Sequence, residues 1–166
     1  MLPLYKFRLS ILLLFLIASG TSHAQFLPNL TDTATKVEIV VPEDSLGRGT
    51  PRGTVNGFIK AVAEQKYIRA SEYLNLDIPK RSAQERERIV KVLQQLLDRG
   101  GNIMANSLLS NKSSGKVDDE LPPEEDLVGT VTHNGEVINL FVEHTGDAAA
   151  PIWKFSSTTI KAVANV

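Results

Sequence analysis

The dipeptide Asn134-Gly135 is the strongest constraint on the fold, because it stands between two segments that alternate apolar and polar residues. Asn-Gly is the preferred pair for a two-residue hairpin turn, in which both residues take positive φ. We therefore predict that residues 126–133 and 136–144 form two antiparallel strands. In the register set by this turn, every apolar residue of one face meets a small or apolar partner. The predicted pairs are His133 with Glu136, Val131 with Ile138, Gly129 with Leu140, and Leu127 with Val142.

A third strand and a closing helix are predicted after the hairpin. In residues 151–157, "PIWKFSS", Trp153 and Phe155 are two residues apart and share one face of a strand. Aromatic residues at this spacing beside an apolar hairpin are typical of a core, and an aromatic platform for a ligand is the alternative. Ile160 and Val163 then indicate a short helix near the end of the chain.

The first helix is predicted from a capping signal and an apolar stripe. Thr50 can accept a hydrogen bond from the first free helix amides, and Pro51 at the first helical position loses no donor. Inside this helix, Gly53 and Gly57 each cost up to about 1 kcal/mol relative to alanine. We therefore expect another backbone to approach closely at both positions, and a ligand-cradling role is the alternative. The apolar stripe consists of Val55, Phe58, Ile59 and Val62.

A second helix is predicted directly after a bend at "EQK", residues 64–66, so that the first two helices form a helical hairpin. Tyr67, Ala70 and Leu74 lie on one face of "YIRASEYLNL" when this segment is helical. Residues 77–80, "DIPK", should end the helix, because the residue before a proline is pushed out of helical geometry.

A third helix is predicted from a capping box, S-x-x-E, formed by Ser82 and Glu85. Gly100 and Gly101 should end this helix, one of them in the left-handed conformation that caps many helices. Between these limits the apolar face consists of Ile89, Val92, Leu93, Leu96 and Leu97.

The chain loses its periodicity between residues 101 and 126, which predicts a long loop or a crossover. Helices that precede antiparallel strands are typical of an α+β domain. We therefore predict that the helical hairpin and the third helix pack on one face of a C-terminal antiparallel sheet.

The first residues have the pattern of a secretory signal peptide. Lys6 and Arg8 precede an apolar run of roughly a dozen residues, which is shorter than the roughly 20 that a membrane-spanning helix needs. The small-residue site "SHA" follows, and cleavage after Ala24 leaves 166 − 24 = 142 residues. An uncleaved signal anchor is the alternative. We expect a signal peptide over residues 1–24, a mobile segment with one short strand over residues 25–43, and a single domain over residues 44–166.

Composition narrows the compartment and the class of partner. The chain has no cysteine, so neither disulfides nor a lipid-modified cysteine can contribute outside the cytoplasm. It has 18 basic and 19 acidic residues, a balance that gives no support for nucleic-acid binding. No second apolar run follows the signal, so residues 25–166 contain no predicted membrane span. We expect an exported protein in the periplasm or at the periplasmic face of the inner membrane.

The sequence offers no catalytic, cofactor-binding or metal-binding residue that stands out. His133 is placed at the hairpin turn and His144 at a strand end, and a surface role is expected for each. The acidic run from Asp118 to Asp126 lacks the glycine and spacing of a calcium loop, so we expect a solvated loop. Any two of the 19 acids could converge as paired carboxylates, but no particular pair is favoured. We therefore predict that the protein is not an enzyme.

Four segments resemble the extracytoplasmic N-terminal domain of one subgroup of MscS-like mechanosensitive channels. They are residues 44–76, "DSLGRGTPRGTVNGFIKAVAEQKYIRASEYLNL", residues 89–101, "IVKVLQQLLDRGG", residues 120–131, "ELPPEEDLVGTV", and residues 152–160, "IWKFSSTTI". The first segment also resembles the paired helices of NTF2-like cone domains. Two departures from the channel group are Glu120 before Leu121-Pro122-Pro123, and "IKAVANV" in place of a later Ile-Pro pair.

The resemblance implies a domain with an assembly or gating-modulation role and no catalytic residue. Its partner would be the channel's transmembrane region, joined by sequence beyond Val166 if the chain is a fragment, and the assembly would be a homo-oligomer. A free secreted NTF2-like module that binds a small apolar ligand is the alternative. An isomerase- or hydratase-like enzyme on the same fold is a third possibility and would need a carboxylate or histidine with a shifted pKa in the cone.

Overall fold

The computed structural model describes residues 44–76, 80–146 and 150–165. The predicted signal peptide, the segment 25–43 and most of the predicted helix stop at residues 77–80 lie outside these ranges. None of the described helices is both long enough and apolar enough to cross a membrane. In chain order the elements are α2 (Pro51–Ala63), α3 (Tyr67–Ser71), α4 (Ala83–Gly100), β1 (Gly101–Ile103), β2 (Glu125–His133), β3 (Glu136–Thr145), β4 (Ile152–Phe155) and α5 (Ser157–Ala164).

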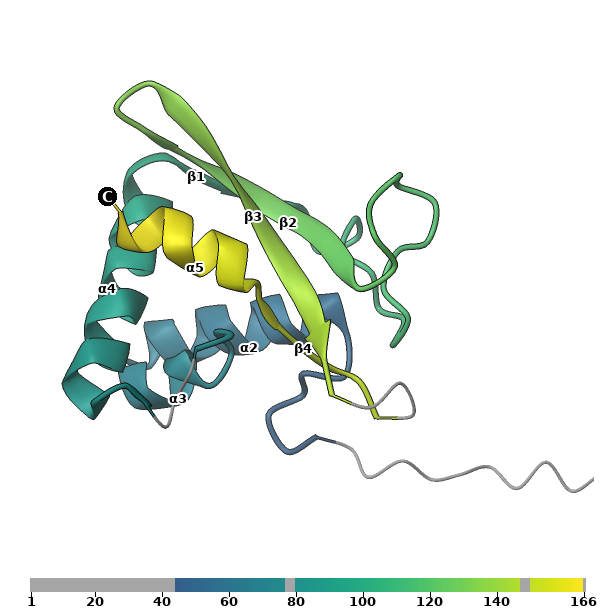
Figure 1. The fold of residues 1–166 in the computed structure, drawn as a ribbon, viewed down its shortest axis with the longest axis horizontal. Helices are drawn as coiled ribbons and strands as arrows, with labels where there is room; N and C mark the ends of the chain where they lie inside the picture. The colour runs from purple at the N-terminus through teal and green to yellow at the C-terminus, as the bar shows by residue number, and fades with distance from the viewer. Residues whose placement is uncertain (1–43, 77–79, 147–149, 166) are drawn as a thin grey trace, which may run out of the picture. The chain divides into compact units, whose positions relative to one another are not determined.

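The fold is α+β, as predicted. The four strands form one antiparallel sheet in the order β1-β2-β3-β4, and the sheet curls into a half-barrel. Helices α2, α3 and α4 pack against one side of the sheet, and α5 packs between α4 and β3 (Figure 1). The helices-first order of the sequence therefore produces two layers around one core.

The hairpin has the predicted turn and most of the predicted register. Asn134 and Gly135 have φ of 49° and 84°, as a two-residue turn of this type requires. Residues 129–133 pair with residues 136–140 as expected. The predicted pair of Leu127 with Val142 is wrong, because a β-bulge at Val128 shifts the register and places Leu127 opposite Phe141.

Helix α2 begins as predicted, but its buried face is rotated from the predicted stripe. The Thr50 side chain accepts a hydrogen bond from the amide of Gly53, and Pro51 is the first helical residue. Val55 and Phe58 are buried, Val62 is partly buried, and Ile59 is 44% exposed, so the prediction for Ile59 is wrong. Burial extends instead to Thr54 and Ala61, because the Thr54 hydroxyl donates to the carbonyl of Trp153 in β4.

The two glycines of α2 meet different neighbours. A Cβ atom at Gly53 would lie 2.1 Å from the carbonyl oxygen of Gly47, so the predicted close backbone is confirmed there. At Gly57 a Cβ atom would lie 2.4 Å from the ring of Tyr73, so the predicted backbone neighbour is wrong and a side chain takes its place.

Helix α3 is shorter than predicted. The bend is present, with Gln65 at φ 57°, and Ala70 and Leu74 are buried. The helix nevertheless ends at Ser71, so the helical prediction for the residues after it is wrong. The chain there runs beside β4, where the Phe155 amide donates to the Tyr73 carbonyl. Pairing with the strand edge has replaced the last helical turns.

Helix α4 starts as predicted and ends differently. The Ser82 hydroxyl accepts from the Glu85 amide, which is one half of the capping box, while Glu85 forms an ion pair with Arg81. Neither Gly100 nor Gly101 has positive φ, so the predicted left-handed cap is wrong. Gly101 instead begins β1, a strand that the sequence analysis did not predict. Of the predicted apolar face, Ile89, Leu93 and Leu96 are buried and Val92 and Leu97 are partly buried.

Aromatic side chains fill the space between helices and sheet. The rings of Phe58 and Phe155 meet edge to face at 5.1 Å between centroids, and Trp153 is fully buried. The core interpretation of Trp153 and Phe155 is therefore confirmed. Helix α5, capped by the Ser156 hydroxyl, adds Ile160 and Val163 to this core, as predicted.

Candidate functional site

The two histidines of the described residues differ in environment. His133 is half-buried at the hairpin and pairs with Glu136. His144 is also half-buried, and its ring lies edge to face against Trp153 at 5.7 Å between centroids. Within the described ranges, no group of three His, Cys, Asp or Glu side chains could hold a metal ion. The prediction of a surface role is therefore too simple for His144, which packs against the core.

The acidic run is not solvated throughout, which corrects the prediction at one residue. Asp118, Glu120 and Glu124 are exposed, whereas Asp126 is only 3% exposed. One carboxylate oxygen of Asp126 accepts from the Lys116 amide at 2.9 Å. Burial raises the pKa of Asp126, because the charged form has lost most of its water.

Two carboxylates face each other across β2 and β3. Glu125 pairs with Glu143 in the sheet register, on the face opposite the buried Val142. Glu143 accepts hydrogen bonds from the Asn75 side chain at 2.5 Å and the Ser157 amide at 2.7 Å. Desolvation and the nearby Glu143 raise the pKa of Glu125. Glu143 thus holds the start of α5 in place, and the pair lies outside the aromatic core.

The long loop between β1 and β2 is fastened to the core at several points. The Arg52 guanidinium donates twice to the Leu109 carbonyl, at 2.8 and 3.1 Å, and the Trp153 indole donates to the Ser113 carbonyl at 2.9 Å. A surface pocket of about 620 Å³ lies beside the loop. Its lining combines three cations with exposed apolar side chains, namely Arg52, Lys112, Lys116, Leu108 and Val117.

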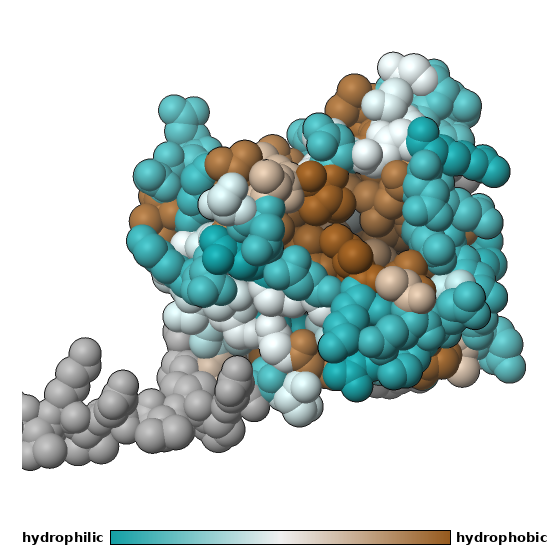
Figure 2. Space-filling view, turned by 180° about the vertical axis from the view of Figure 1, so that it is seen from behind, coloured by the Kyte–Doolittle hydropathy of each residue, from teal (hydrophilic) through white to brown (hydrophobic). Residues whose placement is uncertain are grey.

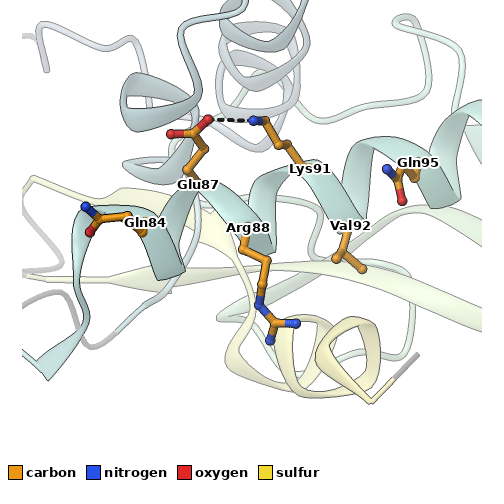
Figure 3. A pocket seen from close by; sticks show the side chains of 6 residues that line it. All are labelled: Gln84, Glu87, Arg88, Lys91, Val92 and Gln95. Atoms are coloured by element: carbon orange, nitrogen blue, oxygen red, sulfur yellow. Dashed lines mark ion pairs between the residues drawn. The ribbon is translucent and has the colours of Figure 1, made fainter.

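A second pocket, of about 490 Å³, lies on the outer surface of α4 (Figure 3). Glu87 and Lys91 form an ion pair at 2.6 Å on one side of the helix, and Arg88 and Val92 project on the other. Gln84 and Gln95 complete the lining. This surface is mostly polar, and its side chains are partly buried or exposed.

Brown, apolar side chains gather in a hollow on the face shown in Figure 2, which is the side away from the viewer of Figure 1. We call this surface the apolar hollow. Asn56 of α2 bonds to Asn106 at 3.0 Å, and Ile59 follows on the same side of the helix. Ile59 is 44% exposed, and Val62, one turn further along α2, is partly buried, so these two residues form an apolar strip at the surface of α2.

Sequence reasoning missed both the burial of Asp126 and the exposure of Ile59. Asp126 looked like one more acid in a charged run, and the only signal for its burial was its position at the start of an apolar strand. Ile59 looked like a core residue, because the helical period alone does not fix which part of an apolar stripe faces the sheet.

Comparison of this chain with protein-family models, with curated proteins and with solved structures found no match in any of the three.

Proposed function

We propose that residues 44–166 act as an extracytoplasmic interaction domain of an MscS-like mechanosensitive channel, with a role in assembly or in the modulation of gating. The domain contributes contacts and no chemistry of its own. The sequence resemblance gives the proposal its direction, because its four segments include the leading segment with α2, most of α4, and β4 with the start of α5.

These segments form the centre of the fold. The Trp153 amide donates to the Arg48 carbonyl at 2.8 Å, and the Thr54 hydroxyl donates to the Trp153 carbonyl at 2.8 Å. Gly101 pairs with Val131 across β1 and β2. The residues that carry the resemblance therefore contact one another, as the shared scaffold of a domain family would.

The observation that carries the proposal is the contrast between a filled interior and an apolar exterior. Trp153, Tyr73, Phe58 and Phe155 occupy the space in which a cone-shaped fold could hold a ligand, and each is at most 2% exposed. The apolar hollow, by contrast, opens outward (Figure 2). Exposed apolar surfaces framed by polar residues are typical of protein interaction sites.

The first test is the coding sequence that follows the codon of Val166. An in-frame series of hydrophobic helices supports a tethered channel domain, and a stop codon directly after Val166 overturns the tethered form of the proposal.

The second test places a charge on the exposed apolar strip of α2 in the channel-linked protein. Ile59→Asp should impair oligomer assembly in detergent or shift the tension threshold in patch-clamp recordings. Ile68→Asp is the matched control, because Ile68 of α3 is 42% exposed, close to the 44% of Ile59, and lies on a different helix. Unchanged assembly and threshold for both variants would contradict the proposed role.

A free secreted module that binds a small apolar ligand is the second candidate, and the apolar hollow favours it too. The hollow is an apolar, recessed surface, as apolar ligand sites commonly are (Figure 2). A thermal-shift screen of the purified protein with long-chain fatty acids and sterols tests this candidate. Stabilisation that Ile59→Asp removes and Ile68→Asp retains supports it, and a screen without any shift counts against it.

A further inference from the structure

The outer edge of β3 is open between the hairpin turn and Phe141. The Phe141 amide donates to the Thr159 hydroxyl at 2.8 Å, and its carbonyl accepts from the Ser156 amide at 2.8 Å, so both groups point away from β2. Backbone groups alternate sides along a strand, so those of Val137 and Asn139 point the same way. Among residues 44–76, 80–146 and 150–165, no group hydrogen-bonds to them on this side.

The other two edges of the described sheet are better covered. On β4, the Trp153 amide donates to the Arg48 carbonyl, and Phe155 exchanges backbone bonds with the segment after α3. Strand β1 has only three residues, and the amide of Gly101 already donates to the end of α4. An added strand would therefore form more backbone hydrogen bonds along β3, around Val137 and Asn139, than along β1 or β4.

We propose that this edge of β3 pairs with the same edge of a second copy of the chain, antiparallel and with the two-fold axis at Ile138. In this register Val137 lies opposite Asn139 of the second copy, and Asn139 lies opposite Val137 of the second copy. Such a pair exchanges both of its N–H···O bonds. The two pairs together satisfy every open amide and carbonyl of Val137 and Asn139 in both chains.

The side chains also fit a second copy in this register. Ile138, partly buried at the margin of the core, meets Ile138. Glu136 lies opposite Leu140, so no like charges face each other across the new pair. Val137, which is 66% exposed, gains a neighbour in Asn139 of the second copy. These contacts are available whether the domain belongs to a channel or acts as a free module, so the inference does not rest on the proposed function.

The expected dimer is reversible. A strand pair of this length buries less than the roughly 1,000 Å² that stable interfaces usually exceed. The population of dimer should therefore rise with protein concentration, in sedimentation experiments on the full chain, from monomer at low micromolar concentration to a measurable dimer fraction in the millimolar range.

Cysteine cross-linking tests the register, because the chain has no cysteine of its own. Ile138→Cys should form a disulfide-linked dimer under mild oxidation, since residues opposite each other in a non-hydrogen-bonded pair have Cα atoms about 4.5 Å apart. Val137→Cys alone and Asn139→Cys alone should not, because diagonal neighbours lie about 7–8 Å apart. A mixture of these two variants should give the mixed dimer.

Proline substitution tests the backbone bonds. Asn139→Pro removes an amide that points away from β2 and should raise the dimer dissociation constant at least tenfold, whereas Asn139→Ser, which keeps the amide, should not. Circular dichroism checks that both variants keep the fold. The proposal is overturned if the chain stays monomeric at millimolar concentration, if Asn139→Pro dimerises as well as Asn139→Ser, or if the mixed cysteine dimer does not form.

Discussion

The leading segment of the domain is held by one arginine, and this gives the sharpest stability prediction. Arg48 donates from Nε and its backbone amide to one oxygen of Asp44, at 3.0 and 2.9 Å, and from Nη2 to the other at 2.8 Å. Its Nη1 donates to the Glu72 carbonyl at 2.8 Å, and its own carbonyl accepts from Trp153. We call residues 44–48 the clasp. The change Asp44→Asn keeps the size of the side chain but removes its negative charge and one of its two accepting oxygens.

The expected cost follows from the burial of the pair. The side chains of Arg48 and Asp44 are 12% and 16% exposed, so water screens their attraction only in part. Hydrogen bonds to charged groups contribute about 1.5–3 kcal/mol, and we expect Asp44→Asn to lower the free energy of unfolding by about 2 kcal/mol at pH 7. For a domain of this size the melting temperature should fall by roughly 8 °C.

The pH dependence of this stability difference tests whether the charge of Asp44 is its cause. The side-chain hydrogen bond from Arg48 holds the pKa of Asp44 below its ordinary value. A carboxyl group whose pKa is lower in the folded state stabilises the fold above its unfolded pKa of about 3.9, and this stabilisation is lost as the pH falls through the folded pKa. The difference between the wild type and Asp44→Asn should therefore be full at pH 7 and shrink below pH 4.

Urea denaturation at pH 7, 5 and 3 measures this difference, with the exposed Asp118→Asn as control. The control should leave stability unchanged within about 0.5 kcal/mol. Equal stability of the wild type and Asp44→Asn at pH 7, or a difference of the same size at pH 3, would refute the reasoning.

Three further predictions concern single positions in or beside the core. Asp126→Asn should raise the melting temperature at pH 7. Burial raises the pKa of Asp126, so ionisation of this carboxyl group above its unfolded pKa destabilises the fold. Calorimetry should show no gain in melting temperature at pH 3, where the carboxyl group is protonated in both states. Gly57→Ala should lower the free energy of unfolding in urea by about 1–3 kcal/mol, because the new methyl group meets the Tyr73 ring, and a stabilised variant would contradict this packing. Trp153→Phe should speed amide exchange around Ser113, because the indole bond to the Ser113 carbonyl is lost; unchanged exchange there would show that this bond does not hold the loop.

Local signals predicted the elements well, and tertiary contacts explain where they failed. The turn at Asn134-Gly135 fixed the nearby register, but a bulge at Val128 has no signature in the alternating pattern, and the pairing changes beyond it. Gly100 and Gly101 correctly predicted the end of a helix, but the physical reason differs from the predicted one. A Cβ atom at Gly100 would lie 2.7 Å from the Thr132 carbonyl, so close contact with β2 explains this glycine without a left-handed cap.

The candidate site was less predictable than the fold. The helical period identified α2 as amphipathic, yet the side on which α2 meets the sheet depends on the bond from Thr54 to Trp153, two residues that are 99 positions apart. That bond, together with the burial of Val55 and Phe58, leaves Ile59 at the surface. The burial of Asp126 depends in the same way on the loop residue Lys116.

The position of β4 has a consequence for how the chain reaches its folded state during synthesis. Its backbone bonds with Arg48 and Tyr73, and its ring contact with Phe58, join the beginning of the domain to its end. These contacts cannot form until the whole segment from Arg48 to Phe155 has been synthesised. A nascent chain must therefore extend past Phe155 before the helices and the last strand can hold each other in place.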